Sequence, residues 1–299
     1  MTIHVVLLNW NQGEPVRTLV QRLLSWTSLP LQPWIVDNAS TDQASRLLPS
    51  DFPQVNHFRN EFNLGYAGGI NTALTAIKEV AEPNDLILLL NNDIQIVEET
   101  LTVLQDCLAQ HPDAGMIGPV LLEGSSENPG KSWGGRNIGD HIYTRISKPP
   151  SFIPEDGCIP VDYVPGTILL FRKSLLDLIG LLDEDFFFSG EIADYALRAR
   201  KAGQICLVCT GVEVAHHAHD EHGHRGTLYL YYSLRNRFLY IRKHAANHKW
   251  LFIKWSVLGL GMAARQLLGG NLSGIRAVML ALTDGWRNKF GNRNELFTR

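Results

Sequence analysis

The sequence is poor in cysteine, in long apolar runs and in leader-like features at its N-terminus. Its four cysteines in 299 residues, at positions 107, 158, 206 and 209, are too few and too scattered for a disulfide scaffold. The longest apolar stretch, Trp250–Ala264, has fifteen residues and includes Lys254, whereas a membrane-spanning helix needs roughly twenty. No basic leader or small-residue cleavage site precedes the first apolar run. We therefore expect no signal peptide, a reducing cytoplasmic location, and a segment at 250–264 that can lie on a membrane but not cross it.

Net charge is also low, at −3, but the charges are unevenly distributed. Residues 225–299 hold thirteen Lys and Arg against two acids, Asp284 and Glu295, whereas the residues before them hold fourteen basic and twenty-eight acidic side chains. A basic segment of this kind is typical of contact with an anionic partner such as membrane headgroups or nucleic acid, and equally of solvated helices. Charge alone leaves these interpretations open.

Three short apolar runs have the pattern of strands that are covered on both faces of a parallel sheet. These runs are Val5–Leu8, Pro33–Val36 and Leu86–Leu90. Apolar residues at helical spacing lie between them, over Val16–Trp26 and Ile70–Val80, which gives the order βαβαβ. That order predicts a doubly wound α/β domain whose ligands bind beyond the carboxyl ends of the strands. From Leu228 onward the pattern is helical.

Polar and glycine-rich segments follow the predicted strands. Asp37 and Asn38 come directly after the second strand, where a carboxylate can accept hydrogen bonds from a ribose hydroxyl or a base N–H. The same residues suit a helix cap or an Asx-turn, so both interpretations stay open. The segment Asn63–Asn71 places Gly65 and Gly68 just before a helix, where the backbone can approach a ligand beside exposed N–H groups. A plain turn explains these glycines as well.

The strand Leu86–Leu90 leads through Asn91 and Asn92 to Asp93. A carboxylate delivered to the ligand-binding edge of a sheet can hold a divalent cation against a diphosphate. The alternative is that Asn92 and Asp93 form a turn and cap the following helix. The position of Asp93 favours a metal site without deciding it.

Two further segments carry ionisable side chains at spacings that suit a site. Glu191 and Asp194 are three residues apart at a helix start, which puts both carboxylates on one helix face, although acids are also favourable there without any catalytic role. His216 opens a histidine-rich stretch that ends at His224, and imidazole is a ligand that Mn and Zn accept, whereas Mg prefers oxygen. Cys206 and Cys209 fit a strand pattern and lack a second ligand pair at the usual zinc spacing.

Several motifs occur together in one order along the chain. They are Val6-Leu7-Leu8-Asn9-Trp10-Asn11, Val36-Asp37-Asn38-Ala39-Ser40-Thr41-Asp42, Asn63-Leu64-Gly65-Tyr66-Ala67-Gly68-Gly69-Ile70-Asn71, Leu90-Asn91-Asn92-Asp93, Val164-Pro165-Gly166-Thr167 with Phe171-Arg172, and Tyr231-Tyr232 with Arg235-Asn236-Arg237. With these motifs nearly the whole chain resembles family 2 glycosyltransferases of the GT-A fold, and especially their bacterial rhamnosyltransferase-like branch.

The resemblance implies a fold, an activity and a set of site residues. The fold would be a mainly parallel, mixed sheet flanked by helices, and the reaction an inverting transfer of a sugar from a UDP-, dTDP- or GDP-linked donor. The acceptor would be a hydroxyl of a glycan or lipid-linked molecule in cell-surface polysaccharide synthesis. Asp93 and His216 would hold Mg²⁺ or Mn²⁺, and Gly166 and Thr167 would face the acceptor. The donor nucleotide would contact Asn9, Asp37, Asn38, Asn63, Gly65, Gly68, Asn71 and Asn92.

The chain departs from the family pattern at two positions. Asn91 replaces the first acid of the family's D-x-D motif, and Ile192 stands where the branch usually has a second acid after Glu191. An inverting transfer needs a carboxylate that takes the proton of the acceptor hydroxyl. We predict Glu191 as this base, with Asp194 as the reserve.

The predicted organisation is a GT-A domain over residues 1–227 and a basic, amphipathic helical segment over 228–299. We expect no nucleic acid partner. The protein would be cytoplasmic or, held by its basic segment, peripheral at the inner face of the plasma membrane. Ile192 and Asn91 keep one alternative open, a non-catalytic nucleotide-sugar or glycan-binding protein of the same fold. A nicotinamide-dependent oxidoreductase is disfavoured, since no G-x-G-x-x-G turn follows the first strand.

Overall fold

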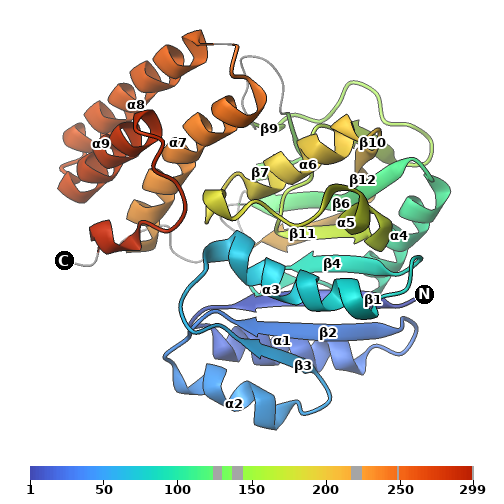
Figure 1. Cartoon of the computed structure of the whole chain (residues 1–299). Coiled ribbons are helices and arrows are strands. Elements are labelled where there is room, and N and C mark those ends of the chain that lie inside the picture. Colours follow the sequence, from blue (N-terminus) through green and yellow to red (C-terminus); the bar gives the residue numbers. More distant parts are fainter. Residues whose placement is uncertain (124–129, 137–143, 217–223, 248, 298–299) are drawn as a thin grey trace.

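The main sheet runs through the centre of the chain's N-terminal three quarters. The computed structural model describes residues 1–123, 130–136, 144–216, 224–247 and 249–297. The sheet has the order β10-β12-β6-β11-β4-β1-β2-β3, with β5 added to β12 and β7 to β6 (Figure 1). Its strands are β1 (Ile3–Asn9), β2 (Leu31–Asp37), β3 (Asn56–Arg59), β4 (Leu86–Leu90), β5 (Ile94–Gln95), β6 (Ala114–Glu123), β7 (Gly130–Ser132), β10 (Cys158–Val161), β11 (Ile168–Arg172) and β12 (Ile205–His216). The short β8 (Gly135–Arg136) and β9 (Thr144–Arg145) pair separately.

The N-terminal half of the sheet is parallel, as the sequence predicts. β1 pairs in parallel with both β2 and β4, so Asn9 and Asp37 are register neighbours at the carboxyl edge. The predicted order βαβαβ is incomplete, however, because α2 (Gln43–Asp51) and β3 intervene between β2 and the next helix. The helix contains Pro49 and the edge strand reads Asn-His-Phe-Arg, so neither shows the apolar periodicity on which the prediction rested.

The other half of the sheet is mixed. β11 is antiparallel to both β4 and β6, whereas β12 is parallel to β6. The segment Val161–Phe171, whose apolar pattern around Gly166 is typical of one strand, belongs to two elements, because β10 ends at Val161 and β11 begins at Ile168. The intervening residues include Gly166 and Thr167, which therefore lie in a loop beside the end of β4.

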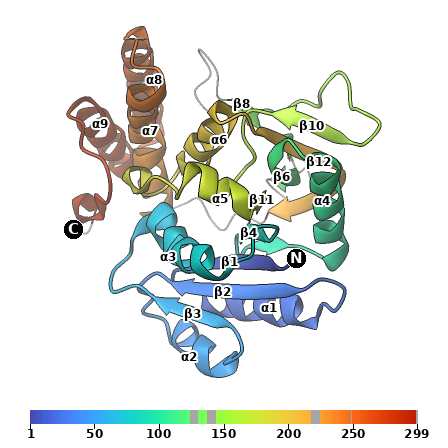
Figure 2. The same ribbon diagram turned by 45° about the vertical axis from the view of Figure 1, so that its right-hand side comes forward.

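Helices cover both faces of the sheet and form two separate apolar cores. The cluster on one face contains Leu19, Leu48 and Leu104, and the cluster on the other contains Leu74, Leu176 and Tyr195. Figure 2 shows α1 and α4 away from α3, α5 and α6 across the sheet. The helices are α1 (Gly13–Ser25), α2, α3 (Gly65–Val80), α4 (Glu98–Gln110), α5 (Lys173–Ile179) and α6 (Glu191–Lys201), with a 3-10 turn, η1, at Glu184–Phe186.

Three helices form the C-terminal part, beside α6 and the 3-10 turn (Figure 1). They are α7 (His224–His244), α8 (Trp250–Leu268) and α9 (Leu272–Trp286), followed by the 3-10 turn η2 (Asn294–Phe297). The predicted boundary between residues 227 and 228 falls inside α7. Tyr231, Phe238 and Ala281 are buried in a core of this part, which also includes Phe187 from the loop before α6. The two parts therefore share packing across the predicted boundary.

The prediction that the segment at 250–264 is too short to cross a membrane is corrected by the helix itself. α8 continues beyond Ala264 to Leu268, and its 19 residues are long and apolar enough to cross a membrane by length and composition. Only 17% of its most apolar 18-residue stretch is buried within the described structure. Gly259 lies tightly against α9, since a Cβ there would meet Leu282 at 2.7 Å. α8 is thus anchored to its neighbours by one face and leaves most of its apolar surface exposed.

Candidate functional site

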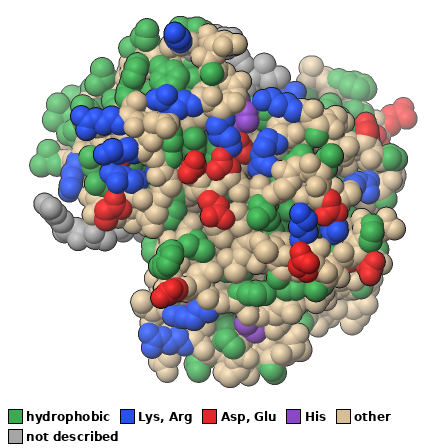
Figure 3. All heavy atoms as spheres, in the orientation of Figure 1, with side chains coloured by type: hydrophobic (Ala, Val, Ile, Leu, Met, Phe, Trp, Pro, Cys, Tyr) green, Lys and Arg blue, Asp and Glu red, His purple; other side chains and the backbone are tan. Residues whose placement is uncertain are grey.

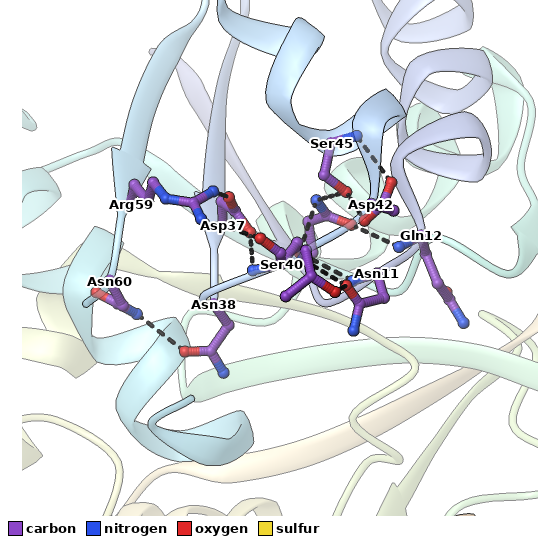
Figure 4. A network of polar contacts seen from close by, with 11 residues as sticks. Asn11, Gln12, Asp37, Asn38, Ser40, Asp42, Ser45, Arg59 and Asn60 are labelled. Atoms are coloured by element: carbon purple, nitrogen blue, oxygen red, sulfur yellow. Dashed lines mark hydrogen bonds and ion pairs between the residues drawn. The ribbon is translucent and has the colours of Figure 1, made fainter. Parts of the chain in front are cut away.

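The carboxyl ends of β1 and β2 carry a polar network around Asp37 (Figure 4). One oxygen of Asp37 accepts a hydrogen bond from the backbone N–H of Ser40 at 2.9 Å, and the other pairs with Arg59. Arg59 also donates to the carbonyl of Ser40 at 2.9 Å. A pocket of about 510 Å³ opens beside this network, lined by Ile35, Asp37, Ser45, Arg46, Pro49, His57, Phe58 and Arg59. Asp37 is 7% exposed and combines a fixed carboxylate with access to this pocket.

Asp93 and His216 are brought together at the next strand ends. β5 follows Asp93 directly and pairs with the last residues of β12, so that Ile94 lies opposite His216. Nε2 of His216 is 3.4 Å from a carboxylate oxygen of Asp93, and its Nδ1 is 3.8 Å from Glu123. The Asp93 and His216 side chains are 18% and 17% exposed. A carboxylate beside an imidazole at a solvent-accessible strand end fits a cation that binds both oxygen and nitrogen ligands, as Mn²⁺ does. The other predicted histidines of the stretch, between 217 and 223, lie outside the described residues.

The loop before β11 lies against this strand end. The backbone N–H of Asn91 donates to the carbonyl of Thr167 at 2.9 Å, and the Tyr66 hydroxyl donates to the carbonyl of Gly166 at 3.1 Å. Gly166 also packs closely on Ile192, because a Cβ there would meet the Ile192 side chain at 2.7 Å. The predicted acceptor-side residues therefore lie between the end of β4 and the start of α6. Asn92 sits in the turn between β4 and β5, half-buried.

Glu191 is the first residue of α6 and is 7% exposed. Its Oε2 is buried and makes no hydrogen bond with the described residues. Burial raises the pKa of Glu191 to about 7, and the nearby Asp194 carboxylate adds to this rise. Burial and, next, the charge of Glu191 also raise the pKa of Tyr66, which links the acid to the Gly166 loop. A carboxyl group that titrates near neutrality, with one oxygen unengaged, has the properties of a general base.

A sequence model of the family described as Glycosyl transferase family 2 matches residues 4–180, which is more than half of the chain. The chain belongs to this family. The predicted resemblance is thereby confirmed, and the protein is a glycosyltransferase. The match includes Asp37, Asp93 and the Gly166–Thr167 loop, and it ends before Glu191 and His216.

Relatives of known function match the glycosyltransferase over most of its length. An N-acetylglucosaminyl-diphospho-decaprenol L-rhamnosyltransferase of Mycobacterium tuberculosis is 23% identical over 94% of this chain and 97% of its own. The low-salt glycan biosynthesis hexosyltransferase Agl10 of Haloferax volcanii is 25% identical over 79% of this chain and 74% of its own. The rhamnosyltransferase match thus extends across the C-terminal helices.

Solved structures confirm the predicted GT-A-type fold. A mannosyltransferase from Pyrobaculum calidifontis in complex with GDP-Man and Mn²⁺ superposes with a TM-score of 0.58 at 13% identity, over 96% of this chain and 87% of that one. GalNAc-T7 with UDP, GalNAc and Mn²⁺ gives a TM-score of 0.62 at 12% identity. The glycosyltransferase matches it over 81% of its own residues but spans only 48% of that chain.

Several residues that were predicted to contact the donor make hydrogen bonds within the fold. Asn38 uses its amide fully: it donates to Asn63 and to the carbonyl of Gly65, both at 2.9 Å, and accepts from Asn60 and from the backbone of Leu64, both at 3.0 Å. Asn9 and Asn71 are likewise buried. Asn9 bonds to Ser40, Ser45 and the backbone of Gln12, and Asn71 holds the backbone of Leu182 and the side chain of Glu184. These amides shape the loops at the strand ends, and their predicted contact with the nucleotide stays a prediction.

The glycines at the start of α3 serve close packing. Gly65 has φ +75°, and a Cβ there would lie 2.3 Å from the carbonyl oxygen of Phe187. That same carbonyl accepts the N–H groups of Tyr66 at 2.6 Å and Ala67 at 3.4 Å. A Cβ on Gly68 would meet Leu64 at 2.8 Å. The loop before α6 therefore occupies the N–H groups of Tyr66 and Ala67, and the predicted contact of Gly65 and Gly68 with the donor stays a prediction.

Asp194 is not available as the reserve base. It is fully buried, with Oδ2 2.8 Å from Arg198 and Oδ1 2.7 Å from both Lys243 and His244. Burial alone would raise its pKa, but the hydrogen bonds from His244 and Lys243 and the charge of Arg198 hold the pKa of Asp194 well below its usual range. Asp194 thus ties α6 to the end of α7.

Sequence reasoning missed the part that Arg235 and Asn236 play. Asn236 is fully buried on α7 and donates to the carbonyls of Phe186, Phe188 and Ser189 at 2.6 to 2.9 Å. Arg235, also buried, donates to the carbonyl of Phe186 at 3.1 Å. The loop they hold has Phe187 and Ser189 at positive φ and leads directly into Glu191. The motif is visible in the sequence. Which carbonyls it binds depends on how α7 packs against the loop before α6, which is distant in the sequence.

Proposed function

We propose that this glycosyltransferase transfers a sugar, with inversion, from a nucleotide-diphosphate donor to a hydroxyl of a lipid-linked glycan of the cell envelope. The observation that carries the proposal is Glu191, whose buried carboxylate titrates near pH 7 with Oε2 unengaged at the start of α6. A direct displacement at the anomeric carbon needs a base on the acceptor side, which takes the proton of the attacking hydroxyl. The activities of the rhamnosyltransferase and hexosyltransferase relatives support the choice of sugar transfer to a glycan.

In this account the two sides of the site have separate tasks. Asp37 would accept hydrogen bonds from the base or ribose of the donor beside the pocket at β2 and β3. Asp93 and His216 would hold a divalent cation, which supplies positive charge to the departing nucleotide diphosphate. The solved mannosyltransferase and GalNAc-T7 complexes, both with Mn²⁺, support this use of a metal. Asn91 contributes an amide where the family pattern has an acid, so Asp93 would bear more of the binding.

Glu191 would remove the proton from the acceptor hydroxyl as the new bond forms. The Gly166–Thr167 loop lies between Glu191 and the end of β4, and it would orient the acceptor against the donor. Ile192, which replaces an acid of the family branch, is 5% exposed and packs on Gly166. The base function therefore falls on Glu191 alone, since Asp194 is engaged with Arg198, Lys243 and His244.

The C-terminal helices would bring the enzyme to a membrane that carries the acceptor. Figure 3 shows Lys and Arg side chains beside hydrophobic ones over α7, α8 and α9. On α8, Ile253, Val257 and Leu260 are 63%, 62% and 53% exposed, and Lys254 and Arg265 are on the same helix. Basic side chains near an anionic membrane contribute about 1 kcal/mol each, in addition to the insertion of apolar ones. Because α8 is held by α7 and α9 along one face, we propose that it lies in the membrane interface and does not cross it.

Donor binding gives the first test. Thermal shifts against UDP-, dTDP- and GDP-sugars, with and without Mn²⁺, would be compared for the wild type and Asp93→Asn. We expect one donor to stabilise the wild type only when metal is present, and the variant to lose that stabilisation. Equal, metal-independent stabilisation of both proteins would contradict the proposed metal site.

A further inference from the structure

Three of the four cysteines meet in one buried cluster, although they come from three separate elements. Cys107 is on α4, Cys158 begins β10, and Cys209 is on β12 directly opposite Cys158 in the antiparallel pair. Their sulfur atoms all lie within 4.8 Å of one another, and Sγ of Cys107 is 3.2 Å from Sγ of Cys209. The three residues are 8%, 3% and 1% exposed. Such a convergence of thiols places three ligands for a soft metal in one spot.

His111 adds a nitrogen ligand at the rim of this cluster. It lies one helical turn after Cys107, at the end of α4, and its Nδ1 is 2.8 Å from the carbonyl oxygen of Cys107. Because a carbonyl oxygen only accepts, Nδ1 carries the hydrogen, which leaves Nε2 as the ring atom that can bind a metal. Metal-binding histidines are commonly oriented by this kind of hydrogen bond to a backbone carbonyl. The ring is therefore preset to bind through Nε2.

Nε2 of His111 faces a second ligand group. It is 3.1 Å from Oδ2 of Asp156, which is a carboxylate at the same rim of the cluster. Ligand atoms of His111, Asp156 and Cys158 lie within 4.8 Å of one another. Asp156 is itself fixed, because its Oδ1 accepts the backbone N–H of Cys158 at 2.9 Å. His111, Asp156 and Cys158 thus bring a nitrogen, an oxygen and a sulfur ligand atom together beside the other two thiols.

We propose that Cys107, Cys158 and Cys209 hold a structural Zn²⁺, with His111, whose ring lies beside Cys158, as its fourth ligand. A tetrahedral zinc with Zn–S bonds of about 2.3 Å requires sulfur atoms about 3.8 Å apart. The three sulfur atoms here lie within 4.8 Å of one another, those of Cys107 and Cys209 at 3.2 Å. Three thiolates and a neutral imidazole are a common ligand set for closed, structural zinc. The ion would join α4 to β10 and β12, which lie together at one side of the sheet (Figures 1 and 2). His111, whose side chain is 20% exposed, gives the ion a route of entry.

The remaining cysteine shows what an ordinary core thiol looks like in this protein. Cys206 is also buried and is on the same strand as Cys209, but it faces the opposite core and contacts the carbonyl of Ala196 at 4.0 Å. It is absent from the groups of three or more metal-binding side chains among the described residues. The cluster is also chemically distinct from the Asp93–His216 pair, which suits a harder cation. Cys206 is therefore a matched control for the three clustered cysteines.

Metal content of the full chain tests the site. The protein would be purified without chelator, with any affinity tag removed, and its metals measured by mass spectrometry. We expect close to one zinc per chain in the wild type, Cys206→Ala and Asp93→Asn, and loss of most of it in Cys158→Ala, Cys209→Ala and His111→Asn. Replacement by Co²⁺ should give thiolate-to-cobalt charge-transfer bands in the wild type, a readout that needs neither a variant nor activity. Absence of both zinc and these bands, with free thiols or a Cys107–Cys209 disulfide instead, would overturn the proposal.

Discussion

Nε2 of His216 lies 3.4 Å from the carboxylate of Asp93, and the pairing of β5 with β12 holds the two side chains together. If both bind the cation that accompanies the donor, loss of the imidazole removes one of few protein ligands. We predict that His216→Ala needs at least about tenfold more Mn²⁺ for half-maximal transfer, a cost of the size seen when groups around a metal are lost. Metal titration of initial rates measures this.

The matched control for His216→Ala is Glu213→Gln on the same strand. Glu213 pairs with Lys131 at the surface and is remote from Asp93 in the pairing register. It should leave the Mn²⁺ requirement unchanged. The same Mn²⁺ requirement in His216→Ala and the wild type would remove His216 from the metal site.

Glu191 gives the reaction a pH dependence with a definite sign. A base acts in its deprotonated form, and burial raises the pKa of Glu191 to about 7. At saturating metal we predict that kcat/KM falls about tenfold per pH unit well below pH 7 and is level above it. An ordinary exposed glutamate would instead put the midpoint near its usual pKa of about 4.3. A rate that stays constant from pH 5.5 to pH 8 would argue against a buried base.

We predict that Asp194 contributes to the free energy of unfolding. Asp194→Asn leaves Arg198, Lys243 and His244 without their buried anion, and breaking such a network costs about 3–5 kcal/mol of unfolding free energy. Because the folded-state pKa is depressed, this stabilisation is present above the unfolded value near 3.8 and is lost as the pH falls further. Urea unfolding should show nearly the full difference at both pH 7 and pH 4, and a difference that shrinks as the pH falls below about 3.8.

The control for this effect is Asp177→Asn, which removes a pair with Lys173 in which the acid is 42% exposed. It should cost no more than about 1 kcal/mol. If Asp194→Asn kept the stability of the wild type and abolished turnover, Asp194 would be catalytic and the structural role wrong.

Much of the donor side follows from the sequence because it depends on local signals. Asp93, shortly after the buried apolar strand β4, and Asp37, at the end of β2, mark the carboxyl edge of a parallel sheet. Which amide contacts the nucleotide and which holds a loop is not a local property. Asn38 binds four groups on the segment 60–65, and the N–H groups at the start of α3 are used by Phe187. Both contacts form only after distant segments pack.

The acceptor side was harder to predict for the same reason. Glu191 and Asp194 look equivalent at a helix start, yet α7 supplies Lys243 and His244 to one of them alone. The loop before Glu191 takes its shape from Asn236, which sequence inspection recognised only as part of a helical motif. The clustering of Cys107, Cys158 and Cys209 likewise has no spacing signature, since three elements contribute one thiol each.

The exposed face of α8 predicts reversible binding to membranes. Full burial of one large aliphatic side chain contributes about 1.5–3 kcal/mol, so Ile253→Glu with Val257→Glu should weaken association with anionic vesicles at least about tenfold. Sedimentation with phosphatidylglycerol vesicles at low salt would measure it. Leu178→Glu, at a position 57% exposed on α5, is the control and should sediment like the wild type. Failure of the wild type to sediment would contradict the proposed membrane contact.

The most direct test of the proposed mechanism compares turnover and donor binding in Glu191→Gln. The amide keeps the size of the side chain but cannot take a proton, and general base catalysis contributes about 10²- to 10⁴-fold. With the donor found by thermal shift, we predict that the variant binds it as the wild type does and loses sugar transfer by a factor in this range. Wild-type turnover in a variant that binds donor normally would show that Glu191 is not the base.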